Sequence, residues 1–118
     1  MPKTLVAELA AEDAKLHTLA KGSRGRVSAA EGAALRDETG RTYASANISL
    51  PTLRLSAIQA VVAQAAAAGS RGIEAVVLVA KSPEPDPASL SAVRELAGEG
   101  VPILSVADGS DDVATHTS

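Results

Sequence analysis

The sequence has 118 residues, a formal net charge of −3, no cysteine and a single aromatic residue, Tyr43. This length predicts one domain. The net charge argues against a general nucleic-acid surface, which needs a concentrated basic patch, and the basic run at residues 23–26 is too short to supply one. Without cysteine, disulfides, thiolate metal ligands and cysteine nucleophiles are excluded. Core volume must come from Leu, Val, Ile and Ala, so we expect backbones to pack closely.

The first half of the chain predicts a helix and then a β-hairpin. Leucines recur on one helical face between residues 4 and 21, and Gly22 is a natural stop signal. Residues 32–36 and 42–48 have the pattern of two strands. Between them, the run Asp-Glu-Thr-Gly at residues 37–40 is typical of a turn.

The second half predicts two helices that alternate with two strands. The Ala-rich run from about residue 53 to residue 68 predicts a buried helix, with Thr52 as its N-cap. The β-branched run at residues 73–80 predicts a central strand covered on both faces. Asp86 and Pro87 then predict the start of a helix that ends near residue 97. Residues 101–107 predict the last clear strand, and from Asp108 the sequence is polar.

The order of elements is therefore α-β-β-α-β-α-β, which predicts a three-layer α/β/α domain with a mixed sheet of four to five strands. We expect residues 1–107 to form this single domain and residues 108–118 to form a mobile polar tail. The N-terminus carries acids where a signal peptide needs an uninterrupted apolar run, and Gln59 and Gln64 interrupt the longest apolar segment. No membrane segment is predicted, and the expected location is the cytoplasm.

Three stretches occur together in an order typical of one family. They are EGAALRDETGRTYASANI from Glu31, SAIQAVVAQAAAAG from Ser56 and DPASLSAVREL from Asp86. With these stretches the chain resembles the cytidine deaminase family, including its blasticidin-S deaminase branch, between about residues 31 and 96. The resemblance implies a cytidine deaminase-like fold and a zinc-activated water. It also implies a glutamate that moves protons to the leaving ammonia.

The residues at the family's catalytic positions do not suit that chemistry. The resemblance places Ser56 at the first zinc-ligand position and Ile58 at the proton-shuttle position. The remaining ligand pair corresponds to Asp86 and Ser89, whose spacing is kept. Serine hydroxyls and one carboxylate are not a zinc site, and isoleucine transfers no proton. We therefore predict no catalytic residue, no bound metal and no cofactor.

Some of these assignments have an alternative. A shifted register would place Glu84 and Pro87, in place of Asp86 and Ser89, at the second ligand pair. Asp86 is also explained as a plain N-cap, and Ser56 as a small packing residue. The two histidines, His17 and His116, lie in no pattern typical of a metal site or a nucleophile.

The family's substrate-binding Asn-x-Glu motif survives in part. Asn47 matches its asparagine, and Ser49 stands where the family has glutamate. These two residues are the candidate ligand-binding positions, although an asparagine before a turn also commonly satisfies backbone groups of its own loop.

We predict a catalytically inactive cytidine deaminase-like protein that acts as an interaction or scaffold module. The resemblance implies a homo-oligomer, either dimer or tetramer, and neither nucleic acid nor a membrane is expected as a partner. The first alternative is a binder of nucleoside-like small molecules with a vestigial pocket near Asn47, Ser56, Asp86 and Ser89. The second alternative is a zinc-dependent cytidine deaminase, which the resemblance alone supports.

Overall fold

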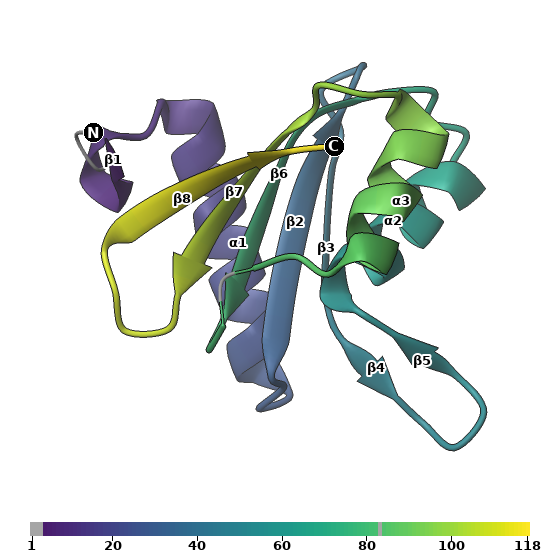
Figure 1. The fold of residues 1–118 in the computed structure, drawn as a ribbon, viewed down its shortest axis with the longest axis horizontal. Coiled ribbons are helices and arrows are strands. Elements are labelled where there is room, and N and C mark those ends of the chain that lie inside the picture. The colour runs from purple at the N-terminus through teal and green to yellow at the C-terminus, as the bar shows by residue number, and fades with distance from the viewer. Residues whose placement is uncertain (1–3, 83) are drawn as a thin grey trace.

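A computed structural model describes residues 4–82 and 84–118. Three α-helices and a short 3-10 helix (η1) accompany the strands (Figure 1). In chain order the elements are β1 (Thr4–Leu5), η1 (Val6–Glu8), α1 (Ala11–Arg26), β2 (Glu31–Asp37), β3 (Thr42–Ala46), β4 (Ile48–Ser49), β5 (Arg54–Leu55), α2 (Ala57–Ala67), β6 (Ile73–Ala80), α3 (Pro87–Ala97), β7 (Pro102–Ala107) and β8 (Asp112–Thr117).

The main sheet is mixed and has the strand order β1-β8-β7-β6-β2-β3. Its neighbouring strands β6 and β7 are parallel and are connected through α3, while β2 is antiparallel to both β3 and β6. Helix α2 connects β3 to β6 across β2. Figure 1 shows α1 on one face of the sheet and α2 with α3 on the other, so the predicted three-layer arrangement is confirmed. The sheet has six strands, however, where four to five were expected.

Two apolar clusters fill the two sides of the sheet, and small residues bring the layers together. Leu35, Ile58 and Leu78 belong to the cluster beneath α2 and α3, and Leu16 and Ala20 belong to the cluster beneath α1. Helix α1 and β2 approach closely at Gly32. A Cβ atom at this position would lie 2.1 Å from the carbonyl oxygen of Ala20. The close packing expected from the composition is therefore present here.

The first helix begins and ends later than predicted. Residues 4–8 form β1 and the 3-10 helix, and α1 runs from Ala11 to Arg26 through Gly22 and Gly25. The helix dipole is positive at the N-terminus and negative at the C-terminus. Acidic residues in the first turn and arginines in the last turn therefore stabilise the two ends of α1. The helix does not end at Gly22 as predicted, because contacts with β2 stabilise the helical residues that follow it.

The Ala-rich helix also begins later than predicted, and Thr52 is not its N-cap. The observed N-cap is Ser56, while Arg54 and Leu55 form β5 and pair with Ser49 and Ile48 of β4. The second strand of the hairpin correspondingly ends at Ala46, before β4 begins. The β4–β5 hairpin extends away from the main sheet (Figure 1). We call residues 48–55 the arm.

The C-terminal residues are not a mobile tail. Asp112–Thr117 form β8, which lies antiparallel to β7 and also pairs with β1. Val113 fills the core beneath α1, and the hydroxyl of Ser118 donates a hydrogen bond of 2.7 Å to the carbonyl of Gly98. Polar residues on the exposed side of this strand explain why the sequence looked like a tail. Among the described residues, no helix is long and apolar enough to cross a bilayer.

The turn between β2 and β3 is organised by the carboxylate of Asp37, whose side chain is buried. One carboxylate oxygen accepts hydrogen bonds from the N–H groups of Thr39 and Arg41 and from the Thr39 hydroxyl, while the other accepts from the Ser70 hydroxyl at 2.6 Å. The Ser70 hydroxyl, followed by the Thr39 and Arg41 donors, outweighs burial and holds the pKa of Asp37 far below its ordinary value of 3.8.

Stability should therefore fall in acid because of Asp37. A carboxyl group with a lowered pKa in the folded state stabilises fully above its unfolded pKa, and this contribution is lost as the pH falls below about 4. We expect Asp37→Asn to be less stable than the parent at pH 7 and to lose less of its remaining stability below pH 4. Urea unfolding at several pH values measures both effects, with the exposed Glu99→Gln as the control. Equal acid sensitivity in Asp37→Asn and the parent would contradict this account.

Candidate functional site

The N-termini of α2 and α3 meet at two serine hydroxyls. Ser56 is the N-cap of α2, and Ser89 lies in the first turn of α3. Their Oγ atoms are 2.6 Å apart, which is a hydrogen bond between two hydroxyl groups. Ser89 is buried and Ser56 is partly buried, so this contact joins the two helices below the surface.

Each serine also takes part in capping its helix. The Ser56 hydroxyl accepts the N–H of Gln59 at 3.0 Å, and the Gln59 side-chain oxygen accepts the N–H of Ser56 at 2.9 Å, which is a complete capping box. In α3, the Asp86 carboxylate accepts the N–H of Ser89 at 2.7 Å, and Pro87 follows at the first helical position. The predicted helix start at Asp86 and Pro87 is confirmed.

A second carboxylate, that of Glu31, reaches the N-terminus of α2. One of its oxygens accepts the N–H of Ala57 at 3.1 Å. Asn47 holds the backbone of Glu31 in place, because its side-chain oxygen accepts the N–H of Glu31 at 2.9 Å. The positive ends of both helix dipoles thus carry a carboxylate, Glu31 on α2 and Asp86 on α3.

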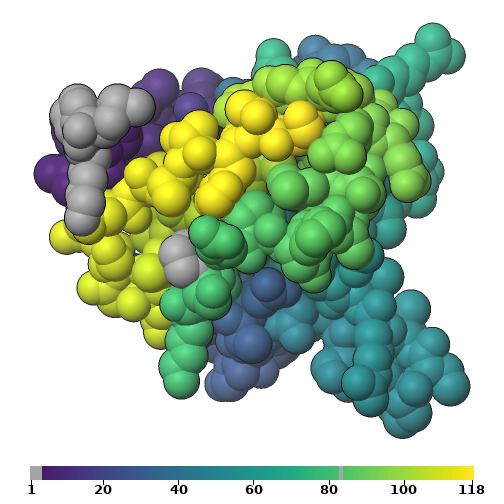
Figure 2. Space-filling view, in the orientation of Figure 1, coloured from purple at the N-terminus to yellow at the C-terminus, as the bar shows by residue number. Residues whose placement is uncertain are grey.

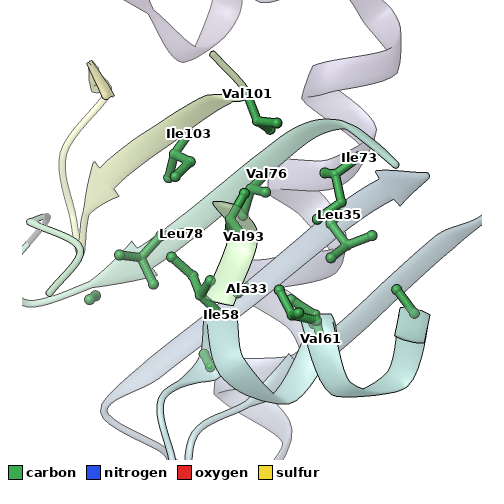
Figure 3. Packing of buried hydrophobic residues seen from close by; sticks show 14 residues of the cluster. Ala33, Leu35, Ile58, Val61, Ile73, Val76, Leu78, Val93, Val101 and Ile103 are labelled. Atoms are coloured by element: carbon green, nitrogen blue, oxygen red, sulfur yellow. The ribbon is translucent and has the colours of Figure 1, made fainter. Parts of the chain in front are cut away.

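Ile58 lies in the apolar core. It is only 1% exposed, and Figure 3 shows its side chain among those of Ala33, Leu78 and Val93. These neighbours carry no group that exchanges a proton. A carboxylate at this position would be buried among hydrocarbon side chains, which makes its ionised form costly.

This arrangement does not suit a metal or a nucleophile. Zinc prefers thiolate, imidazole and carboxylate ligands, whereas Ser56 and Ser89 offer neutral hydroxyls that already bond to each other. Within residues 4–82 and 84–118, no three His, Cys, Asp or Glu side chains are grouped so that they could hold a metal ion. The contacts of the Ser56 hydroxyl in this part of the chain are Ser89 and an N–H group, neither of which is a base that could activate it.

The other candidate residues lie apart from the serine pair. Ser49 is exposed on β4. His17 is on α1, beneath the opposite face of the sheet, where burial and then the nearby Lys21 lower its pKa. His116 is on β8, opposite Ile103 of β7. Among the described residues, Ser56, Ser89 and Asp86 lie together, and Asn47 is connected to this group through Glu31.

Sequence reasoning missed two members of this group, Gln59 and Glu31. A signal for Gln59 was present, since Ser-x-x-Gln is the pattern of a capping box and also locates the start of α2. Glu31 gave no such signal, because its partner Ala57 is 26 residues away along the chain.

Comparisons with known proteins agree on the fold. The family model described as cytidine deaminase-like matches residues 9–110. A crystal structure of cytidine deaminase from Burkholderia pseudomallei is 21% identical, with a TM-score of 0.69 over 86% of this chain and 90% of that chain. One from Mycobacterium leprae is 22% identical, with a TM-score of 0.61 over 84% and 91%. No curated protein matches the sequence.

Because the family model covers most of its length, the chain belongs to the cytidine deaminase-like family. The two solved structures show the same fold, at identities that carry no information about activity.

Proposed function

We propose that this protein is a catalytically inactive member of the family and that it works in the cytoplasm as an interaction or scaffold module. We further propose that it forms homo-oligomers. Neither nucleic acid nor a membrane is part of this proposal.

One observation carries the proposal. At the positions that the resemblance assigns to zinc ligands, Ser56 and Ser89 form a hydroxyl pair with an oxygen separation of 2.6 Å. The carboxylates of Asp86 and Glu31 at the same place are committed to backbone N–H groups of the two helices. These contacts fasten α2 to α3 and to β2, which supports a structural role. The buried Ile58 removes the proton shuttle as well, and such a group typically contributes roughly 10²- to 10⁴-fold to a rate.

The test is the metal content and activity of the purified protein. After growth with added zinc, we expect far less than one zinc ion per chain. We also expect no conversion of cytidine to uridine by ultraviolet absorbance. A stoichiometric zinc ion, or turnover that a chelator abolishes, would overturn the proposal, and His17, Asp86 and His116 would then be examined as ligands.

An alternative function is the binding of a nucleoside-like molecule, and a specific observation favours it. Asn47 and Ser49 both line an open groove with a volume of about 690 Å³, although Ser56, Asp86 and Ser89, which were expected in the same pocket, are not in its lining. Within the described residues, the Asn47 amide nitrogen has no hydrogen-bond partner, so it is available to a ligand. A native-state ligand raises the melting temperature. A panel of nucleosides and nucleotides should therefore shift the melting temperature of the parent but not that of Asn47→Ala, and a panel without effect would rule this alternative out.

A further inference from the structure

The open groove of about 690 Å³ carries a positive charge that no acidic residue balances. Among the described residues that line it, Arg26 at the end of α1 is the one that is charged. A smaller pocket of about 250 Å³ is different, because its lining holds Asp108 and Asp111 as well as Lys21. On a chain with a net charge of −3, a groove with an unbalanced guanidinium is a local exception that favours an anionic ligand.

The side chain of Arg26 is available to such a ligand. Helix α1 has two arginines in its last turn, Arg24 and Arg26. Arg24 is already engaged, because its Nε donates to the carbonyl of Ala30 at 3.2 Å and its Nη1 lies 3.1 Å from the carboxylate of Asp108. Within the described part of the chain, the Arg26 side chain forms neither a hydrogen bond nor an ion pair. Its guanidinium therefore keeps the forked donor geometry that binds phosphate or carboxylate oxygens.

Uncharged donors accompany Arg26 in the lining. Ser23 lies three residues before Arg26 on α1, so the two share a face of the helix. The Ser49 hydroxyl and the Asn47 amide nitrogen line the groove from the β3–β4 side. None of these three groups has a hydrogen-bond partner among the described residues. Several free donors around one cation suit a phosphate group, which accepts at three oxygens, better than a carboxylate, which accepts at two.

The groove is larger than a phosphate group alone would need. Its volume lies in the range of about 300–1,000 Å³ that is typical of sites for small organic ligands. Val27 and Leu50, which line it, are 64% and 53% exposed and offer apolar surface to the body of a ligand. Figure 2 shows the arm, to which Leu50 belongs, standing clear of the rest of the surface at the lower right, and the groove beside it is open to solvent. The groove thus suits a ligand with an anionic group and an organic body.

We propose that this groove binds a phosphorylated small molecule of the class of nucleoside monophosphates, with the phosphate on Arg26 and the rest of the molecule along the groove. The inference rests on the nucleoside-binding alternative within the proposed function, and it adds the phosphate and the residue that recognises it. Ser56 and Ser89 are not in the lining, so the ligand is held away from the positions where the resemblance places the zinc ligands. Binding at this groove therefore requires no catalysis.

Calorimetric titration of the full chain tests the proposal, with the common ribonucleoside monophosphates, the corresponding nucleosides and inorganic phosphate as probes. At least one monophosphate should bind roughly tenfold or more tightly than its nucleoside, because hydrogen bonds to a charged group are added. Inorganic phosphate should bind more weakly than that monophosphate by a similar factor. Arg26→Gln should remove the preference for the monophosphate, whereas Arg26→Lys, which keeps the charge without the fork, should retain part of it. Added salt should weaken binding of the monophosphate but not of the nucleoside.

Arg54→Gln is the matched control for Arg26→Gln. Arg54 is exposed on the arm, and it is not in the lining of the groove. Its replacement removes the same charge from the neighbourhood, and the preference for the monophosphate should remain. Equal affinity for monophosphates and nucleosides, an equal loss in the two variants, or inorganic phosphate that binds as tightly as the monophosphate would overturn the proposal.

The same titrations separate this inference from the proposed function. If nucleosides bind as tightly as monophosphates and Asn47→Ala abolishes both, the inference fails and the nucleoside-binding alternative stands. If no probe binds, the inference and that alternative both fail. Zinc content and cytidine turnover, measured on the same samples, test the inactive-enzyme proposal independently of either result.

Discussion

Replacing Gly32 with alanine is expected to lower the free energy of unfolding by about 3 kcal/mol or more, the upper range for overpacked sites. The added Cβ would lie 2.1 Å from the carbonyl oxygen of Ala20 and 2.8 Å from the Cβ of Arg24. Both neighbours belong to α1, and the nearer one is backbone, so the whole helix must move away from β2. Thermal unfolding should show a melting temperature lower by roughly 10 °C or more.

Gly25→Ala is the matched control for this prediction. Gly25 lies inside α1, and a Cβ atom there would meet no atom within 4 Å. Alanine should therefore stabilise the helix by about 0.5–1 kcal/mol, because it restricts the unfolded chain without a clash. If both substitutions changed the melting temperature equally, this would contradict the conclusion that Gly32 is needed for α1 to pack closely on β2.

Three cysteines are expected to let the protein bind a zinc ion that, under the proposed function, the parent does not bind. In Ser56→Cys/Asp86→Cys/Ser89→Cys, thiolates would stand at the two helix N-termini, where the dipoles lower thiol pKa values. Tetrahedral zinc accepts three such ligands and leaves one position for water. We expect close to one zinc ion per chain by mass spectrometry of the metal, and zinc should raise the melting temperature. Cytidine should remain unconverted, because Ile58 transfers no proton.

The alternative register supplies the control for this experiment. Ser56→Cys/Glu84→Cys/Pro87→Cys carries the same number of thiols at the same spacing. It should bind zinc far more weakly, because it is Ser89 that contacts Ser56. Stronger zinc binding by this second variant would show that Asp86 and Ser89 do not correspond to the ligand pair. The contact between Ser56 and Ser89 would then not lie at the family's zinc position.

The parts of the fold that were predictable from the sequence are those with local causes. The β-branched run of β6 indicates a strand buried on both faces, and Asp86 with Pro87 defines the start of α3 to the residue. The arm and β8 were not predictable, because two-residue strands and a mostly polar strand depend on hydrogen-bond partners elsewhere in the chain. Tertiary contacts likewise carry α1 past Gly22, against its local preference.

The candidate site, like the fold, was predictable from the sequence only in part. The family resemblance assigned Ser56, Ile58, Asp86 and Ser89 to the catalytic positions, but it gave no reason for the two serines to form a hydrogen bond with each other. Nor did it indicate that Glu31 would cap the helix that begins at Ala57. Both contacts depend on how β2, α2 and α3 meet, which is a property of the assembled fold.

The pairing of β1 with β8 has a consequence for how the protein is made. Thr4 lies opposite Val113 and Leu5 opposite Asp112, so the earliest described strand of the chain pairs only with the latest. On the ribosome β1 is synthesised long before β8, its partner strand. The pairing of β1 must therefore wait until β8 has left the ribosome, and a premature stop codon before β8 would also leave β1 unpaired.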